Sequence, residues 1–179
     1  MSFHAEKLMA WRVAAFGGPE NLAPVYRDIP SPASDEILIR VKASAVSRAD
    51  GMIRAGEPKL GRVFLLMNHP NRPLIGTCFS GEVSAIGSSV TRFGVGDQVF
   101  GMTGMNFGAN ASHLSLREDG VVVEKPAALS FVEAAVIGDG AITSYNFLKE
   151  VAELGAGEKI LILGAAGSLG SAAVQIAAA

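Results

Sequence analysis

The sequence has few of the residues that would assign it to several large classes of protein. Only one of its 179 residues is a cysteine, so an internal disulfide is impossible and a reducing compartment is expected. Charged residues make up 18%, and the formal charge is −2 with no basic patch, which argues against a nucleic-acid partner. Because 49% of the residues are apolar, composition excludes disorder and provides enough material for a core.

Long uninterrupted apolar runs are missing as well. The opening segment MSFHAEKLMAWR has no apolar stretch of the kind found in secretory signals, so residues 1–10 are expected to form a frayed tail. Residues 160–179 carry no charge, but glycines, serines and Gln175 interrupt them. That composition favours a turn and a helix over a membrane span. The predicted location is therefore cytoplasmic, with no membrane partner.

Short strand-like segments separated by glycine-rich turns fill the first two thirds of the chain. In residues 36–47, Ile37, Ile39 and Val41 alternate with charged side chains, the pattern of a half-buried strand. Residues 47–56 predict one or two helical turns closed by a glycine, and Trp11 and the phenylalanines are expected in the core. Closely spaced strands with glycine turns predict a small, partly open barrel.

The pattern changes after Pro126. Ser130 followed by Glu133 forms a capping box, which predicts the start of a helix that ends near Gly155. The segment KILILG, residues 159–164, then predicts a continuous apolar strand of the kind buried on both faces of a parallel sheet. The sequence therefore predicts a β-rich domain over residues 1–126 and the beginning of an α/β domain over 127–179.

A glycine turn follows that predicted strand. AAGSLG supplies Ala165-x-Gly167-x-x-Gly170, the second and third glycines of a dinucleotide-binding turn, with Gly164 just before the first position. In such turns the amides at the start of the helix bind the pyrophosphate. The alternative is a tight strand-to-helix turn without a ligand. The predicted cofactor-binding residues here are Ala165, Ala166, Gly167, Ser168, Leu169 and Gly170.

Five quoted segments identify a resemblance that covers residues 11–177. They are GGPENL, ILIRVKASAVSRADGMIRAG, PLIGTCFSGEVSAIGSSVTRFGVGDQVFG, VEKPAALSFVEAAVIGDGAITSYNFL and GEKILILGAAGSLGSAAVQIA. In this order they resemble the medium-chain dehydrogenase/reductase superfamily, in its zinc-independent quinone oxidoreductase-like branch. The resemblance implies a GroES-like catalytic domain followed by a Rossmann domain, and a chain that is the N-terminal fragment of a longer enzyme.

The same resemblance implies a cofactor and partners. The cofactor would be NADPH, with NADH possible, because the acidic residue expected roughly 20 residues beyond the turn falls past Ala179. The substrate would be a small molecule, and the parent protein would be a homodimer. The 179-residue chain would be inactive alone. By the same resemblance, Thr143 would contact the nicotinamide end of the cofactor.

Zinc-using relatives have a different set of side chains at the matching positions. Ser47 stands where they have cysteine, Asp50 is retained, and Thr77-Cys78 replaces a His-Glu pair. Hydroxyls are poor zinc ligands. The histidines, His4, His69 and His113, show no ligand spacing, so no metal is expected.

Without a metal, hydrogen-bond donors must polarise the substrate, and the candidates are Ser47 and Thr77. Each hydroxyl could instead satisfy a local turn. Asp50 is expected to have a structural role or to pair with Arg54, four residues on, and Cys78 is expected to be a buried apolar residue.

The predicted function is NAD(P)H-dependent reduction of quinones, enones or related carbonyls. Many quinone oxidoreductases have asparagine at the Ser47 position and tyrosine at the Met52 position, so quinone specificity is open. Two alternatives remain at this point. The protein could be a non-catalytic cofactor-binding or structural member of the same fold, or a GroES-like module with no catalysis of its own.

Overall fold

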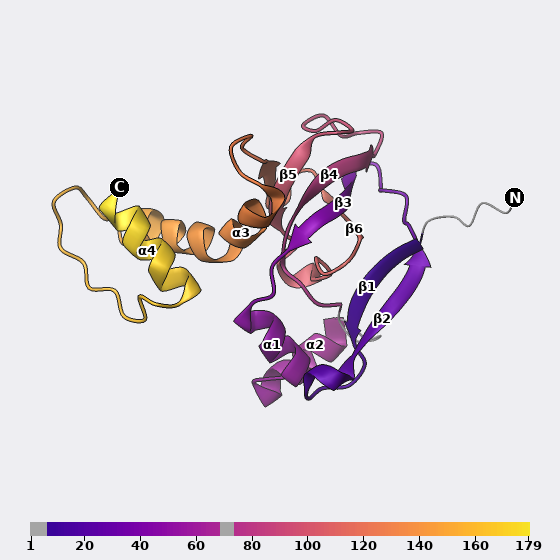
Figure 1. Cartoon of the computed structure of the whole chain (residues 1–179), viewed down its shortest axis with the longest axis horizontal. Coiled ribbons are helices and arrows are strands. Elements are labelled where there is room, and N and C mark those ends of the chain that lie inside the picture. Colours follow the sequence, from indigo (N-terminus) through magenta and orange to yellow (C-terminus); the bar gives the residue numbers. More distant parts are fainter. Residues whose placement is uncertain (1–6, 69–73) are drawn as a thin grey trace, which may run out of the picture. The chain divides into compact units, whose positions relative to one another are not determined.

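The computed structural model describes residues 7–68 and 74–179. The chain divides into two compact units, residues 1–135 and 136–179. Two strands form a separate antiparallel ribbon at the start of the first unit (Figure 1). They are β1 (Lys7–Val13) and β2 (Leu22–Asp28), joined through the short 3₁₀ turn Pro19–Asn21. Residues 7–10, assigned above to a frayed tail, belong to β1, because Leu8 and Ala10 are buried.

Within the described residues, the main sheet has five strands in the order β6-β3-β4-β5-β7, all pairs antiparallel. Its strands are β3 (Glu36–Ser44), β4 (Cys78–Ile86), β5 (Gln98–Met102), β6 (His113–Arg117) and β7 (Val122–Glu124). A 3₁₀ turn, Gly104–Asn106, follows β5. Both sheets are open in the described part of the chain, which confirms the partly open β-rich architecture.

The core of the first unit lies on one face of the main sheet. Alternation in β3 places Ile37 and Ile39 inside with no exposed surface, while Arg40 faces outward. The buried cluster that they join contains Phe79, Val83, Phe93, Val99, Ala109, Leu114 and Val122. Trp11 lies outside this cluster and remains 39% exposed, so its assignment to the core is wrong.

Two short helices follow β3. They are α1 (Arg48–Ala55) and α2 (Lys59–Asn68). Gly56 ends α1 in the left-handed conformation at φ 69°, where a glycine carries no Cβ penalty, which confirms the predicted stop. The segment that follows Gly56 contains α2, and residues 69–73 lie outside the described residues.

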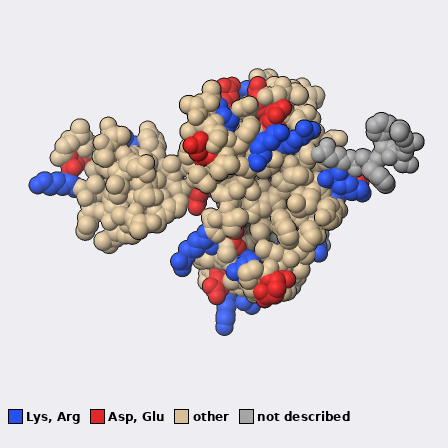
Figure 2. Space-filling view, in the orientation of Figure 1, with Lys and Arg blue, Asp and Glu red and all other residues tan. Residues whose placement is uncertain are grey.

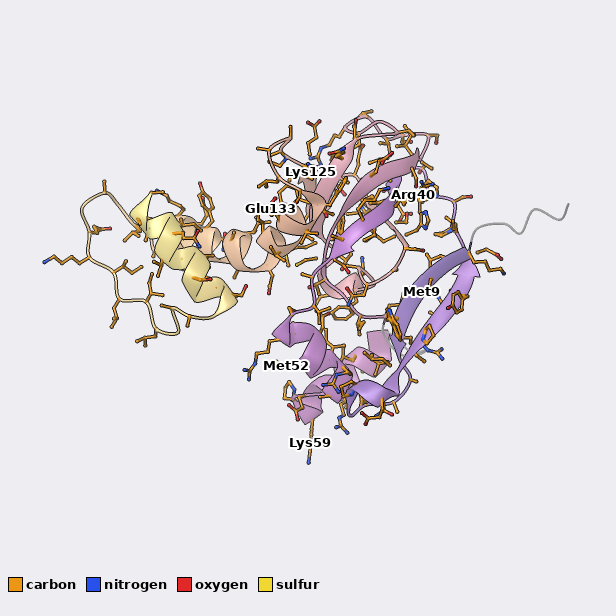
Figure 3. The ribbon with its side chains drawn as sticks, in the orientation of Figure 1. Met9, Arg40, Met52, Lys59, Lys125 and Glu133 are labelled. Carbon is orange, nitrogen blue, oxygen red and sulfur yellow. The ribbon has the colours of Figure 1, made fainter. Side chains whose placement is uncertain are left out.

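The chain then enters the second unit through α3 (Phe131–Asn146), which continues as a π-helical turn, Phe147–Val151. Ser130 and Glu133 form the predicted capping box: the Glu133 carboxylate accepts the Ser130 N–H at 2.8 Å and its hydroxyl at 2.7 Å. Figure 3 places Glu133 near the start of α3. The last helix is α4 (Ser168–Ala178).

The predicted strand KILILG is not formed. Residues 159–164 have no strand pairing, and Leu161 and Leu163 are 83% and 84% exposed. An apolar strand of a parallel sheet needs neighbouring strands to satisfy its backbone groups and cover its side chains. The described residues of the second unit contain no such strand, so the segment runs as an irregular connection.

Candidate functional site

One buried carboxylate organises the segment that carries Ser47. Asp50 is 2% exposed, and its Oδ2 accepts the Ser47 N–H at 2.8 Å and the Ser47 hydroxyl at 3.1 Å. Ser47 is the N-cap of α1, so Asp50 acts as the acid of a capping box three residues into the helix. This arrangement fixes the position of the Ser47 side chain at the start of the helix.

The other oxygen of Asp50 reaches the segment that carries Thr77. Asp50 Oδ1 accepts the Gly76 N–H at 2.8 Å across 26 residues of sequence. Ser47 and the Ile75–Gly76 peptide, one residue before Thr77, therefore lie on the two oxygens of one carboxylate. The structure brings the two predicted donors into the same region, and sequence spacing alone gave no reason to connect them.

The segment at Gly76 is held tightly from its other side. Gly76 has φ +96°, and a Cβ there would collide with the backbone nitrogen of Asn110. The Thr77 carbonyl accepts the Thr103 N–H at 2.8 Å, and the Thr77 hydroxyl lies 3.7 Å from the Cys78 sulfur. Only glycine fits at this left-handed position. The peptide that precedes Thr77 is held through its Gly76 carbonyl, which accepts the Ala109 N–H at 3.0 Å.

These contacts agree with the structural role expected for Asp50. The ion pair expected with Arg54 is a different matter. Arg54 donates to the Gly17 carbonyl, so the expected Asp50–Arg54 pair does not form. The three donors around Asp50 are neutral N–H and O–H groups, which stabilise a buried carboxylate by hydrogen bonding. Cys78 is buried at 1% exposure, as expected for a structural cysteine.

In residues 7–68 and 74–179, no group of three or more His, Cys, Asp or Glu side chains could hold a metal ion. His113 is buried on β6, with its Nδ1 3.2 Å from the Ser112 hydroxyl. His4 and His69 lie outside the described residues.

A cleft of about 800 Å³ lies in the first unit between the β1–β2 ribbon and the end of β3. Its wall includes Met9, Trp11 and Leu22 on one side and Val41 and Val46 on the other. Val46 precedes Ser47, but neither Ser47 nor Thr77 lines the cleft. Met52, on α1, is 39% exposed and is labelled in Figure 3.

The glycine turn lies wholly within the second unit. Gly164 has φ +74°, and its carbonyl accepts the Gly167 N–H at 3.0 Å. Gly167 is the N-cap of α4, and Ser171 N–H makes a helical bond to its carbonyl at 2.9 Å. A Cβ on Gly170 would collide with the Gly164 carbonyl and lie 2.6 Å from the Ala165 Cα. Gly164 therefore makes the tight turn, a role that the aligned pattern had left to Ala165.

This turn leaves donors available. Among the described residues, the N–H groups of Ser168, Leu169 and Gly170 have no partner, and Gly167 provides no side-chain cap. Ala165 and Ala166 are exposed in the turn. An exposed helix start with free amides is the chemistry that binds a phosphate, since the amides and the helix dipole both favour an anion.

Two residues of α3 contact this turn and were not predicted. Ser144, 4% exposed, donates its hydroxyl to the Leu169 carbonyl at 2.7 Å, and Gly140 lies against Ser168. The only sequence signal for them is the small size of both side chains on a helix. Thr143, the predicted cofactor contact, is the half-exposed neighbour of Ser144.

In the part of the chain that the structure describes, none of the groups with a shifted pKa is among the residues that contact Asp50 or among those of the glycine turn. Two backbone N–H groups, from Arg92 and Thr91, hold the pKa of Glu118 below its ordinary value. Acidic and basic side chains are interspersed on the face seen in Figure 2. No helix in the described residues is long and apolar enough to cross a membrane.

The open antiparallel sheets of the first unit are those of a GroES-like domain. The chain matches the alcohol dehydrogenase GroES-like domain family over residues 33–154 and belongs to it, within the quinone oxidoreductase-like branch of the medium-chain dehydrogenase/reductase superfamily.

Two solved structures and one curated relative give the scale of the similarity. The chain is 35% identical to the quinone oxidoreductase of Homo sapiens over 181 residues, covering 97% of this chain and 51% of that protein. The quinone oxidoreductase structure from Coxiella burnetii gives a TM-score of 0.86 at 29% identity, covering 97% of this chain and 54% of the other. The Escherichia coli quinone oxidoreductase complexed with NADPH gives 0.79 at 30% identity, covering 95% and 49%. The chain thus spans about half the length of these proteins.

Proposed function

We propose that the protein is an oxidoreductase that uses NADPH to reduce quinones, enones or related carbonyls, without zinc. The observation that carries this proposal is the glycine turn, whose free N–H groups at residues 168–170 suit a pyrophosphate. Support for the cofactor comes from the Escherichia coli relative, which is complexed with NADPH. When bound, the nicotinamide supplies the hydride, and the protein supplies binding and orientation.

In the first unit, we propose that Thr77 donates a hydrogen bond to the substrate oxygen, and that Ser47 does so once its hydroxyl turns away from Asp50 Oδ2, to which it donates in this structure. Asp50 accepts N–H groups of both Ser47 and Gly76, so it fixes the backbone of the two segments that carry these hydroxyls. Hydride addition to carbon leaves negative charge on that oxygen, and a proton from solvent completes the reduction. A zinc ion is not required in this scheme, and removal of metal by a chelator should leave the rate unchanged.

The test is NADPH oxidation by the full-length protein with a series of quinones and enones. Removing one donor, in Ser47→Ala or Thr77→Val, should lower kcat by about 10²-fold, the effect of losing one oxyanion-hole donor. Ser84→Ala is the control. It removes another hydroxyl of the first unit, one that donates a hydrogen bond to the Leu38 carbonyl at 3.1 Å and has no proposed contact with the substrate. Absence of NADPH binding in the wild type would overturn the proposal.

The non-catalytic alternative makes a distinct prediction in the same assay. The exposed Met52 and Ser47 stand where many quinone oxidoreductases have tyrosine and asparagine. If the protein binds NADPH but turns over no quinone or enone, the non-catalytic alternative is favoured. For the full-length protein we also propose a cytoplasmic homodimer, which sedimentation and cell fractionation would test.

A further inference from the structure

The first turn of α4 is attached to α3 at two points. The Ser144 hydroxyl donates to the Leu169 carbonyl at 2.7 Å. One turn earlier on α3, Gly140 has no room for a side chain: a Cβ there would lie 2.6 Å from the Ser168 Oγ and 2.8 Å from the Ser168 carbonyl oxygen. The backbone of residues 168–169 thus rests directly on α3.

The packing around this attachment is open. A cavity of about 410 Å³ lies between α3 and α4 and is lined by Val136, Ile137, Ala172 and Gln175, together with Gly140 and Ser168 at its edge. Side-chain interdigitation therefore contributes little there, and the contacts of Gly140 and Ser144 determine where the start of α4 lies. Both contacts are made to the residues whose N–H groups are free.

We propose that Gly140 and Ser144 are positioning residues for the glycine turn. They hold the first turn of α4 so that the N–H groups of residues 168–170 converge on one pyrophosphate. This inference rests on the proposed use of NADPH and adds two residues that do not themselves touch the cofactor. The physical reason is that hydrogen bonds weaken steeply when their angle becomes poor, and that a misplacement of about 1 Å can cost about 10²-fold.

The test compares NADPH affinity in two variants of the full-length protein with that of the wild type. Gly140→Ala should weaken binding about tenfold, because the added methyl must displace the Ser168 backbone from its place. Ser144→Ala is the milder variant and should weaken binding about threefold through loss of one hydrogen bond. The KM for NADPH should rise in both variants while kcat stays the same.

Two controls match these changes. Gly51→Ala is also a glycine replacement inside a helix, but the added methyl meets nothing within 4 Å. Ser84→Ala removes a hydroxyl-to-carbonyl bond of the first unit. Both should keep wild-type affinity for NADPH. Adenosine 2′-monophosphate, which has no 5′-phosphate to reach the turn, should bind all variants equally, whereas general loosening of the domain would weaken its binding too.

The outcomes separate this inference from the function on which it rests. If the wild type binds NADPH and both α3 variants bind it equally well, the positioning role is wrong and the proposed function stands. Equal weakening of NADPH and of the monophosphate would also overturn it. If the wild type binds no NADPH, the proposed function fails and this inference fails with it.

Discussion

Asp50 is the residue on which most of the first site depends. Its two oxygens accept the hydroxyl and the N–H of Ser47 and the N–H of Gly76, which follows Asp50 by 26 residues. The sequence indicated a structural role for this residue, which the contacts support. It could not identify Gly76 as the partner, because that contact depends on where α1 lies against the segment before β4.

The first prediction concerns this carboxylate. In Asp50→Asn the amide nitrogen must face either the Ser47 N–H or the Gly76 N–H, so one buried donor loses its acceptor. The free energy of unfolding should fall by about 1–3 kcal/mol. Urea unfolding of the purified chain measures this change.

Asp97→Asn is the control for that experiment. Asp97 is half-buried and accepts the Gly94 N–H at 2.7 Å through one oxygen, so an asparagine can keep the bond by presenting its carbonyl oxygen. Its loss of stability should be smaller. Equal losses in the two variants would contradict the role assigned to Asp50.

At the scale of single elements, the sequence predicted a helix end or a strand correctly where the residues that determine it lie close together in the chain. Ser130 and Glu133 start α3, Gly56 ends α1, and β3 alternates from Ile39 onward, although Leu38 is buried as well. Trp11 shows the limit of such signals. A large apolar side chain predicts burial, but Trp11 lies on the two-stranded ribbon, where it lines the cleft and stays partly exposed.

The second prediction concerns the start of α3. Hydrogen bonds from the Ser130 hydroxyl and then its N–H lower the pKa of Glu133 below the ordinary 4.5. A lowered folded-state pKa stabilises the fold above the ordinary value, and the contribution is lost as the pH falls through the folded-state pKa. Glu133→Gln should therefore be less stable than the wild type at neutral pH, and the difference should shrink on acidification below about 4.5.

Urea midpoints at neutral and acidic pH measure this effect. Glu150→Gln, on the exposed helical turn after α3, is the control and should show no comparable pH dependence. A stability difference for Glu133→Gln that stays constant from neutral to acidic pH would mean that the charge of this capping box contributes nothing.

For the molecule as a whole, the two units differ in how much apolar surface they cover. The first unit buries a continuous cluster around Ile37, Phe79 and Val99. In the second, the apolar segment 160–163 has no sheet to join, and Leu161 and Leu163 are almost fully exposed.

The third prediction follows from that difference. Limited proteolysis of the 179-residue chain should cut first within residues 152–167, at the exposed Lys159 with trypsin or at Leu161 and Leu163 with chymotrypsin. Proteases cut where the backbone is accessible and free of regular structure. Mass spectrometry of the first fragments identifies the sites. A first cut inside β3 or β4, or resistance throughout 152–167, would contradict the exposure described here.

The sequence by itself determined the family, the helix caps, the strand alternation and the place of the glycine turn. These are properties of residues close together in the chain, or of motif order along it. Only the tertiary structure decided that one carboxylate joins Ser47 to Gly76, that Gly164 makes the turn, and that Gly140 and Ser144 support it. Such contacts join distant segments, and their energies depend on distances of a few ångströms that no local pattern encodes. The segment KILILG also depends on distant segments. Its sequence predicts a buried strand, but such a strand forms only where neighbouring strands provide its hydrogen bonds.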